Sequence, residues 1–299
     1  MVSELPAAVA LLLRKGVAYL VERGVSEAEA NAEFLMASVL GCGRGVVLAS
    51  GSRELPWKSQ RHYWELVKRR GRRVPLAYVL GTQPFAGLEF KVSPSVLIPR
   101  PETEELVERV LVLVRESFPG RGGPGRPPIN IVELGTGSGC VAVALAKRLP
   151  DAVVCACEVS VPALRIAEEN ARLNGVERRI RFVHEDLFKT RNGSAPRWAD
   201  VLVSNPPYVP TRELAGLEPE VRAEPVLALD GGRDGLDAIR AIAAEAPGTL
   251  RAGGWLVLEF GDGQADRVRG ILRACGFADI DVKRDLQGRD RIVLGRLAK

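Results

Sequence analysis

The stretch Glu133-Leu134-Gly135-Thr136-Gly137-Ser138-Gly139 decides the fold. The apolar run Ile129–Leu134 predicts a strand that leads into it, and Cys140–Leu149 predicts a helix that leaves it. Glycines at alternate positions allow a sharp turn whose backbone approaches a ligand closely. The spacing departs from the dinucleotide fingerprint G-x-G-x-x-G, because the third glycine comes one residue early. Taken alone, such a turn fits a simple tight connection as well as a ligand site.

Strand and helix patterns alternate after this turn. Strands are predicted at Ala152–Cys157, Ile180–Val183, Asp200–Val203 and Gly254–Phe260, and helices at Pro162–Leu173 and Gly235–Ala246. This order predicts an α/β fold, a mostly parallel sheet with helices on both faces. The last two strand-like runs, Ala278–Lys283 and Arg291–Leu297, are too close in sequence for a crossover helix, so we expect them to pair antiparallel at an edge of the sheet.

The sequence before the sheet predicts a second architecture. Residues 1–75 have the periodicity of a small helical bundle, in which Ser26 and Glu29 have the spacing of a capping box. Glycine and proline punctuate residues 76–100, which predicts a hairpin linker. We therefore divide the chain into a helical docking domain (1–75), the linker (76–100) and a sheet domain (101–299). The stretch 121–128 is predicted to be a mobile loop.

Composition excludes several classes of protein. The chain has 299 residues, a net charge of +5 and no run approaching the ~18 apolar residues of a membrane span. Its N-terminus lacks the basic and then apolar order of a signal peptide, so we expect a cytoplasmic protein without a membrane partner. The five scattered cysteines and two histidines make no zinc set, and we expect no metal site. No Lys-Ser/Thr pair follows the glycines, which excludes a P-loop.

Two acids follow the predicted strands on the same side as the glycine turn. Glu158 ends the second strand, where an acid can accept hydrogen bonds from ribose hydroxyls. Asp186 ends the third strand, where a carboxylate can accept from an adenine amino group or simply cap a loop. Ligands of open α/β sheets bind at the carboxyl ends of the strands. These residues predict a cofactor that carries a nucleoside but no triphosphate.

The tetrapeptide Asn205-Pro206-Pro207-Tyr208 follows the fourth predicted strand. Its prolines restrict the backbone, so that the Asn205 side chain and the carbonyls of residues 205 and 206 converge on one small space. Two acceptors beside an aromatic ring suit a flat NH2 group, such as an amide or the exocyclic amine of a base. A rigid turn without chemistry is the alternative, and the position in line with the glycine turn argues against it.

The combination of motifs resembles a known family. The glycine turn and Asn-Pro-Pro-Tyr are similar to class I methyltransferases that act on amino groups. Four further segments resemble the PrmC/HemK family of peptide chain release factor glutamine N5-methyltransferases. They are Arg72–Gly81, Phe85–Val92, Val96–Glu104 and Glu224–Leu236. The resemblance covers most of the chain and implies a Rossmann-like class I methyltransferase sheet.

The resemblance also implies a cofactor, a substrate and site residues. The cofactor would be S-adenosylmethionine, and the substrate the glutamine of the Gly-Gly-Gln motif in release factors. Catalysis would involve Asn205, Pro206 and Tyr208, with Pro207 also contacting the substrate. The cofactor site would comprise Gly135, Thr136, Gly137, Ser138, Gly139, Glu158, Asp186, Leu187 and Asn205. The chain departs from the family in having Glu158 where aspartate is usual and Leu187 where an aromatic residue often follows the acid.

Other functions stay open at this point. An enzyme with Asn-Pro-Pro-Tyr can methylate a ribosomal-protein glutamine or N6 of adenine in nucleic acid, where a flipped base offers the same flat amino group. The modest charge and the lack of a zinc or helix-turn-helix module argue against a stable nucleic-acid partner. A non-catalytic module that docks on the translation machinery is a further alternative. We expect a monomer.

Overall fold

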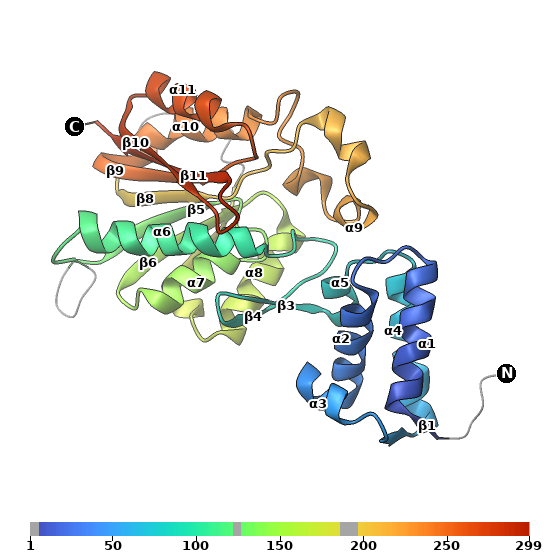
Figure 1. Ribbon diagram of the computed structural model, residues 1–299. Coiled ribbons are helices and arrows are strands. Elements are labelled where there is room, and N and C mark those ends of the chain that lie inside the picture. The colour runs from blue at the N-terminus through green and yellow to red at the C-terminus, as the bar shows by residue number, and fades with distance from the viewer. Residues whose placement is uncertain (1–5, 122–126, 186–196, 299) are drawn as a thin grey trace. The chain divides into compact units, whose positions relative to one another are not determined.

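The computed structural model describes residues 6–121, 127–185 and 197–298 (Figure 1). They form two compact units. The helical unit contains the described residues up to Gly81 together with Glu218–Ala223, and the sheet unit contains Thr82–Leu217 and the chain from Glu224 onwards. The predicted loop at 121–128 falls largely outside the described residues, as do Asp186 and Leu187.

The helical unit confirms the predicted N-terminal bundle. Its elements are α1 (Val9–Glu22), α2 (Ala28–Leu40), α3 (Arg44–Ala49), α4 (Trp57–Gly71), α5 (Leu76–Leu80) and α9 (Pro219–Arg222), and β1 (Ala7–Ala8) pairs antiparallel with β2 (Glu54–Leu55). Their apolar faces share one core, which includes Leu20, Leu35, Met36, Tyr63 and Val67. Burial of these faces supplies the stability of helices this short.

The start of α2 differs from the prediction. Glu27 precedes the helix in a left-handed conformation (φ 51°), and no side chain caps the first turn. Ser26 therefore lies one residue outside the cap position, and the predicted capping box is wrong. Asn31 instead donates hydrogen bonds to the carbonyls of Ser26 (3.1 Å) and Glu27 (2.9 Å).

An ion-pair cluster joins α4 to the segment 218–223 within the helical unit. Arg70 is buried and donates to Glu220 (Nη1–Oε1, 2.7 Å) and to Asn31 Oδ1 (2.7 Å). Arg73 makes a two-pronged contact with the same carboxylate, at 2.6 Å for both pairs of atoms. Burial raises the pKa of Glu220, but the hydrogen bonds from Arg73 and Arg70 outweigh burial and lower it to about 2. Arg70 and Arg73, at the end of α4 and just after it, thus have a structural role within the helical unit.

The sheet unit contains a sheet of seven described strands. Their order is β10 (Phe277–Arg284), β11 (Asp290–Leu297), β9 (Leu250–Glu259), β8 (Ala199–Ser204), β5 (Ile129–Leu134), β6 (Ala152–Glu158) and β7 (Ile180–His184). The last two strands pair antiparallel at the edge, as predicted. The strand that runs against the others is β11, which lies between β10 and β9. The predicted α/β class is confirmed.

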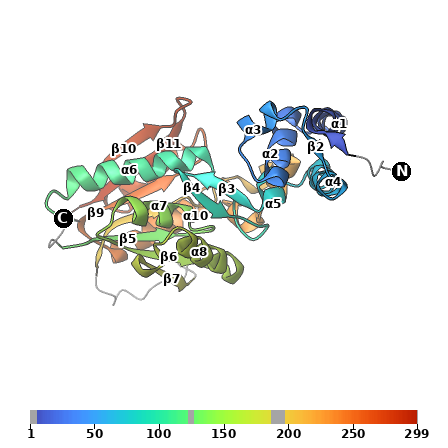
Figure 2. The same ribbon diagram turned by 90° about the horizontal axis from the view of Figure 1, so that it is seen from below.

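Helices cover both faces of this sheet (Figure 2). On β8, Val201 and Val203 face one core and Leu202 the other, as the two-residue period of a strand requires. The first core contains α6 (Pro101–Ser117), α7 (Cys140–Arg148) and residues of α8 (Val161–Leu173), and the second contains α10 (Asp237–Thr249) and α11 (Ala265–Ala274). The sequence analysis did not predict α11. Short 3-10 turns occur at Glu177–Arg179, Thr211–Gly216 and Val226–Ala228.

The hairpin predicted between the two domains belongs to the sheet unit. Its strands β3 (Thr82–Phe85) and β4 (Leu88–Lys91) pair antiparallel. Phe85 and Phe90 are fully buried in the core that contains α6 and α7, with their rings edge to face at 5.9 Å. The hairpin is therefore anchored by apolar packing.

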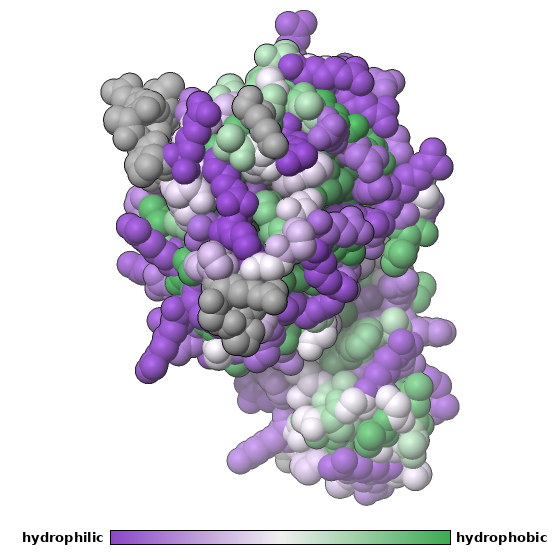
Figure 3. Space-filling view, turned by 90° about the vertical axis from the view of Figure 1, so that its left-hand side faces the viewer, coloured by the Kyte–Doolittle hydropathy of each residue, from purple (hydrophilic) through white to green (hydrophobic). Residues whose placement is uncertain are grey.

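Hydrophilic side chains cover most of the face shown in Figure 3, with smaller apolar areas between them. None of the described helices combines the length and apolar character needed to cross a bilayer.

Candidate active site

A cavity of about 430 Å³ opens at the carboxyl ends of the parallel strands. Its size lies within the range of small-molecule sites in proteins. The strand ends, the glycine loop, the tetrapeptide and two further segments contribute to its wall, including Glu133, Gly135, Thr136, Gly137, Ser138, Glu158, Asn205, Pro206 and Pro207. The structure thus brings most of the described candidate residues to one place, whereas Gly139 and Tyr208 are not part of the wall.

The glycine loop needs its glycines for two different reasons. Gly135, Gly137 and Gly139 all have positive φ, between 56° and 79°, which side chains rarely adopt. At Gly139, a Cβ would also lie 3.0 Å from the Cβ of Ala167 on α8. Gly139 therefore does not line the cavity, but it lets the start of α7 pack closely on α8.

Glu158 lies at the end of β6 and is buried. Its Oε2 accepts a hydrogen bond from the Gly137 N–H and its Oε1 one from the Ser160 N–H, both at 2.9 Å. The carboxylate thus links the glycine loop to the start of α8. Each oxygen has a further lone pair that can accept from a ligand hydroxyl.

Glu133 lies below the glycine loop and is almost completely buried. Its Oε2 accepts hydrogen bonds from the Thr136 hydroxyl and the Ala142 N–H. Burial raises the pKa of Glu133 and the two hydrogen bonds lower it. The effect of burial is the larger, and the pKa rises to about 8. Near neutral pH, the base of the cavity therefore carries a largely uncharged carboxyl group.

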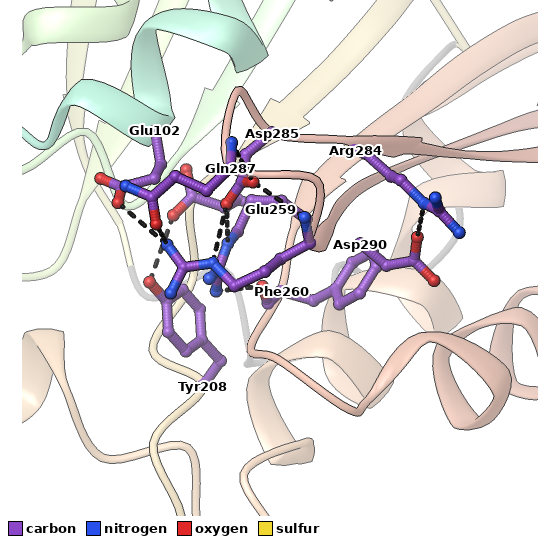
Figure 4. Close-up of polar contacts among 10 residues, drawn as sticks. Glu102, Tyr208, Glu259, Phe260, Arg284, Asp285, Gln287 and Asp290 are labelled. Carbon is purple, nitrogen blue, oxygen red and sulfur yellow. Dashed lines mark hydrogen bonds and ion pairs between the residues drawn. The ribbon is translucent and has the colours of Figure 1, made fainter.

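The tetrapeptide spans two hollows of the sheet unit. Asn205, Pro206 and Pro207 line the cavity, whereas Tyr208 lines a neighbouring open cleft of about 1340 Å³. Asn205 Nδ2 donates to Thr103 Oγ1 on α6 (3.0 Å). The Tyr208 hydroxyl lies 3.2 Å from Glu259 Oε1 at the end of β9 (Figure 4), and its carbonyl accepts from Gln264 Nε2 (3.0 Å).

Two glycines beyond the tetrapeptide fit closely against its backbone. A Cβ at Gly231 would lie 2.8 Å from Tyr208 Cα, and one at Gly235 would lie 2.3 Å from the Tyr208 carbonyl oxygen. The Val209 N–H donates to the Leu229 carbonyl (2.9 Å), and the Val209 carbonyl accepts from the Gly231 N–H (2.8 Å). The Gly-Gly-x-Asp-Gly segment thus fixes the tetrapeptide by close backbone packing.

The segment before α6 forms another part of the cavity wall. Ser95, Leu97, Pro99 and Arg100 line it, together with Pro225, Leu227 and Ala228. Buried Glu224 joins the two segments, because its carboxylate accepts from the Ile98 N–H (2.9 Å) and pairs with Arg100. Two motifs that are far apart in sequence thus build one wall.

Sequence reasoning missed three residues that hold the tetrapeptide, namely Thr103, Glu259 and Gln264. Thr103 lies inside the quoted motif Val96–Glu104, but nothing in the sequence indicated which residue it contacts. Of these, only Glu259 had an available signal, because it is a polar residue at the end of an apolar strand near the predicted sheet edge that carries ligands.

The comparisons with known proteins agree with this geometry. The family described as the PrmC N-terminal domain matches residues 12–81, and the methyltransferase small domain matches residues 125–217. A release factor glutamine methyltransferase of Geobacter sulfurreducens is 43% identical over 280 residues, which cover 93% of each chain. The chain belongs to the release factor glutamine methyltransferase family. A second member, from Moorella thermoacetica, is 41% identical over 94% of this chain and 96% of its own.

Solved structures agree on the fold of the sheet unit. The N-terminal domain of human METTL16 in complex with SAH has a TM-score of 0.51, with 16% identity over 71% of this chain and 77% of that one. At this identity, the match supports the methyltransferase fold alone. The relatives confirm the family resemblance read from the sequence.

Proposed function

We propose that this protein transfers a methyl group from S-adenosylmethionine to the side-chain amide nitrogen of the glutamine in the Gly-Gly-Gln motif of peptide chain release factors. The observation that carries the proposal is the shared cavity, in which Asn205, Pro206 and Pro207 of the tetrapeptide border the same space as the glycine loop. The names of the relatives and their coverage of nearly the whole chain support the same assignment.

The residues present fit S-adenosylmethionine. The wall combines a backbone loop without side chains at Gly135 and Gly137, a carboxylate at Glu158 for ribose hydroxyls, and apolar groups from residues such as Val96 and Ile242. The predicted adenine contacts Asp186 and Leu187 lie outside the described residues. When bound, the cofactor supplies an electrophilic methyl group on sulfur.

The chain's own residues would act on the substrate amide. An amide nitrogen is a poor nucleophile because its lone pair is delocalised into the carbonyl group. Asn205 Oδ1 and the Pro206 carbonyl would accept both N–H bonds and hold the nitrogen toward the methyl group, and positioning of this kind contributes roughly 7–11 kcal/mol in favourable systems. The same acceptors stabilise the positive charge that develops on nitrogen, and the proton leaves after the transfer.

The position of Tyr208 suggests the direction from which the glutamine enters. Tyr208 lines the open cleft, whereas Asn205 and Pro206 line the cavity. A glutamine that entered from the cleft would pass the Tyr208 ring before its amide reached the two acceptors. We propose that Pro207 and Tyr208 orient the amide plane along this path.

The remaining parts of the assignment are proposals of the same kind. The helical unit would dock the release factor, and the protein would act in the cytoplasm because its substrate belongs to the translation machinery. We also expect a monomer. Size-exclusion chromatography with light scattering tests the monomer, and deletion of residues 1–75 with measurement of KM for the release factor tests docking.

The central experiment is incubation of the protein with S-adenosylmethionine and a purified release factor, followed by peptide mass spectrometry. We expect one added methyl group on the glutamine of Gly-Gly-Gln, and none when that glutamine is replaced by alanine. A parallel reaction with RNA and DNA tests the alternative substrate. Methylation of adenine N6 without methylation of the release factor, or no transfer to any of them, would contradict the proposal.

A further inference from the structure

Four side chains form a continuous hydrogen-bond chain behind the tetrapeptide. Asn205 Nδ2 lies 3.0 Å from Thr103 Oγ1, which lies 2.8 Å from Glu259 Oε2. The other oxygen of this carboxylate, Oε1, lies 3.2 Å from the Tyr208 hydroxyl. Thr103 and Glu259 are almost completely buried, at 2% and 1% exposed, so water does not compete for these bonds. The first and last members of the chain belong to the tetrapeptide.

The direction of donation along this chain follows from what each group can do. An ionised carboxylate only accepts, so the hydroxyls of Thr103 and Tyr208 both donate to Glu259. Thr103 has one hydroxyl hydrogen, and it is used in that bond. Its oxygen can then only accept from Asn205, which requires the NH2 end of the Asn205 amide to face Thr103. The carbonyl end, Oδ1, is left for the cavity that Asn205 lines.

We infer that Thr103 and Glu259 are positioning residues that set the orientation of the Asn205 amide, so that an acceptor and not a donor faces the substrate NH2 group. This inference rests on the proposed function, in which Asn205 accepts from the glutamine amide. The side-chain amide of asparagine is nearly symmetric in shape, so packing alone does not distinguish its two orientations. A flipped Asn205 would present NH2 to NH2 and could not bind the substrate.

The surroundings of Glu259 decide when it is ionised. Thr103 and Glu102 approach it from α6, Tyr208 from the loop after β8 and Arg291 from β11. Figure 4 shows Glu259 together with Glu102 and Tyr208. Burial raises the pKa of Glu259 to about 7, and Glu102 also raises it, whereas the bonds from Thr103 and Tyr208 and the charge of Arg291 lower it. As the pH rises through this pKa, Glu259 becomes an ionised carboxylate that only accepts, and the orientation is fixed. As the pH falls through it, the fraction of protonated Glu259 that can donate to Thr103 increases, and the orientation is progressively lost.

The test changes the positioning residues Thr103 and Glu259 and leaves Asn205 in place. Thr103→Val removes the hydroxyl at nearly constant shape, and Thr103→Ser restores it. We expect Thr103→Val to lower kcat at least tenfold at pH 8.5, with KM for the release factor and Kd for S-adenosylmethionine within threefold of wild type. Thr103→Ser should recover kcat to within threefold of wild type. Thr82→Val on β3, which lines neither the cavity nor the cleft, is the matched control.

A pH profile gives a second readout that a merely structural role would not change. Wild-type kcat should fall as the pH decreases from 8 to 6, and Glu259→Gln should show no such fall because the amide does not titrate. Wild-type enzyme that does not methylate release factors would overturn the proposed function. Active wild-type enzyme with Thr103→Val turnover within twofold, or an unchanged acid limb in Glu259→Gln, would overturn the positioning role alone. Thermal unfolding of each variant identifies any that fails to fold, and the pH profile of Glu259→Gln then decides.

Discussion

Glu158 holds the glycine loop by accepting a hydrogen bond from the Gly137 N–H over 2.9 Å. Because its second oxygen accepts from Ser160, the carboxylate fixes the loop and the start of α8 together. We proposed that the same carboxylate also accepts from the ribose of the cofactor. One residue would then both shape the cavity and bind its ligand.

The first prediction concerns this double role. Glu158→Ala removes the ribose acceptor and the bond to Gly137, so we expect the Kd for S-adenosylmethionine to rise at least tenfold, measured by isothermal titration calorimetry. A tenfold change corresponds to about 1.4 kcal/mol. Glu158→Gln keeps an acceptor oxygen for the loop and should lose less affinity. Equal affinity of Glu158→Ala and wild type would mean that the ribose contact is wrongly assigned.

The second prediction concerns Asn205. Asn205→Ala removes the proposed acceptor for the substrate NH2 group, and loss of a single well-placed polar group of this kind lowers kcat by roughly 100-fold to 1000-fold. We expect a loss of that size in release factor methylation, measured by mass spectrometry over time. The Kd for S-adenosylmethionine should stay within about threefold of wild type. Normal turnover of Asn205→Ala would remove the proposed contact with the amide.

The sequence was sufficient for the parts of the fold that depend on local pattern. The apolar runs on either side of Gly135–Gly139 are strong signals because β5 and α7 are buried on most sides. The helix α11 was missed although its apolar residues Val268 and Leu272 have helical spacing and charged residues lie next to them in the sequence, which is the pattern of an amphipathic helix. Its place is set by tertiary contact with β10 and β11, which sequence pattern does not reveal.

The sequence predicted residues that line the cavity but not the residues that hold them in place. Asn205 and Glu158 stand out because each follows a predicted strand. Thr103 and Glu259 are 156 residues apart, and their bond exists only because α6 packs across the end of β9. The contact of Gly235 with Tyr208 likewise exists only in the folded chain. It explains why residue 235 is a glycine, which the sequence alone shows only as part of a motif. Pairing across such separations requires the fold.

The third prediction concerns the acid stability of the helical unit. The pKa of Glu220 falls from an ordinary value of 4.5 to about 2 on folding, so its contribution is fully present above pH 4.5 and is lost as the pH decreases toward 2. We expect this contribution to be on the order of 2 kcal/mol after allowance for the partly exposed partner Arg73. Urea unfolding of Glu220→Gln, followed by circular dichroism, should show lower stability at pH 7 and a smaller decrease between pH 5 and pH 2.5. Glu65→Gln, whose carboxylate is half exposed on α4, is the control and should behave like wild type.

The fourth prediction compares two glycine-to-alanine substitutions. Gly139→Ala places a side chain on a residue with φ 79° and within 3.0 Å of Ala167, so we expect a loss of about 1–3 kcal/mol in the free energy of unfolding. Gly270 lies inside α11, has no positive φ and has open space at its Cβ position. Gly270→Ala should therefore stabilise the protein by about 0.5–1 kcal/mol. Because the first change shifts α7 away from α8 at the cavity, it should also weaken S-adenosylmethionine binding, whereas Gly270→Ala should leave that binding unchanged. Equal effects of the two substitutions on stability and affinity would show that the left-handed conformation of Gly139 and its close packing on Ala167 do not shape the cavity.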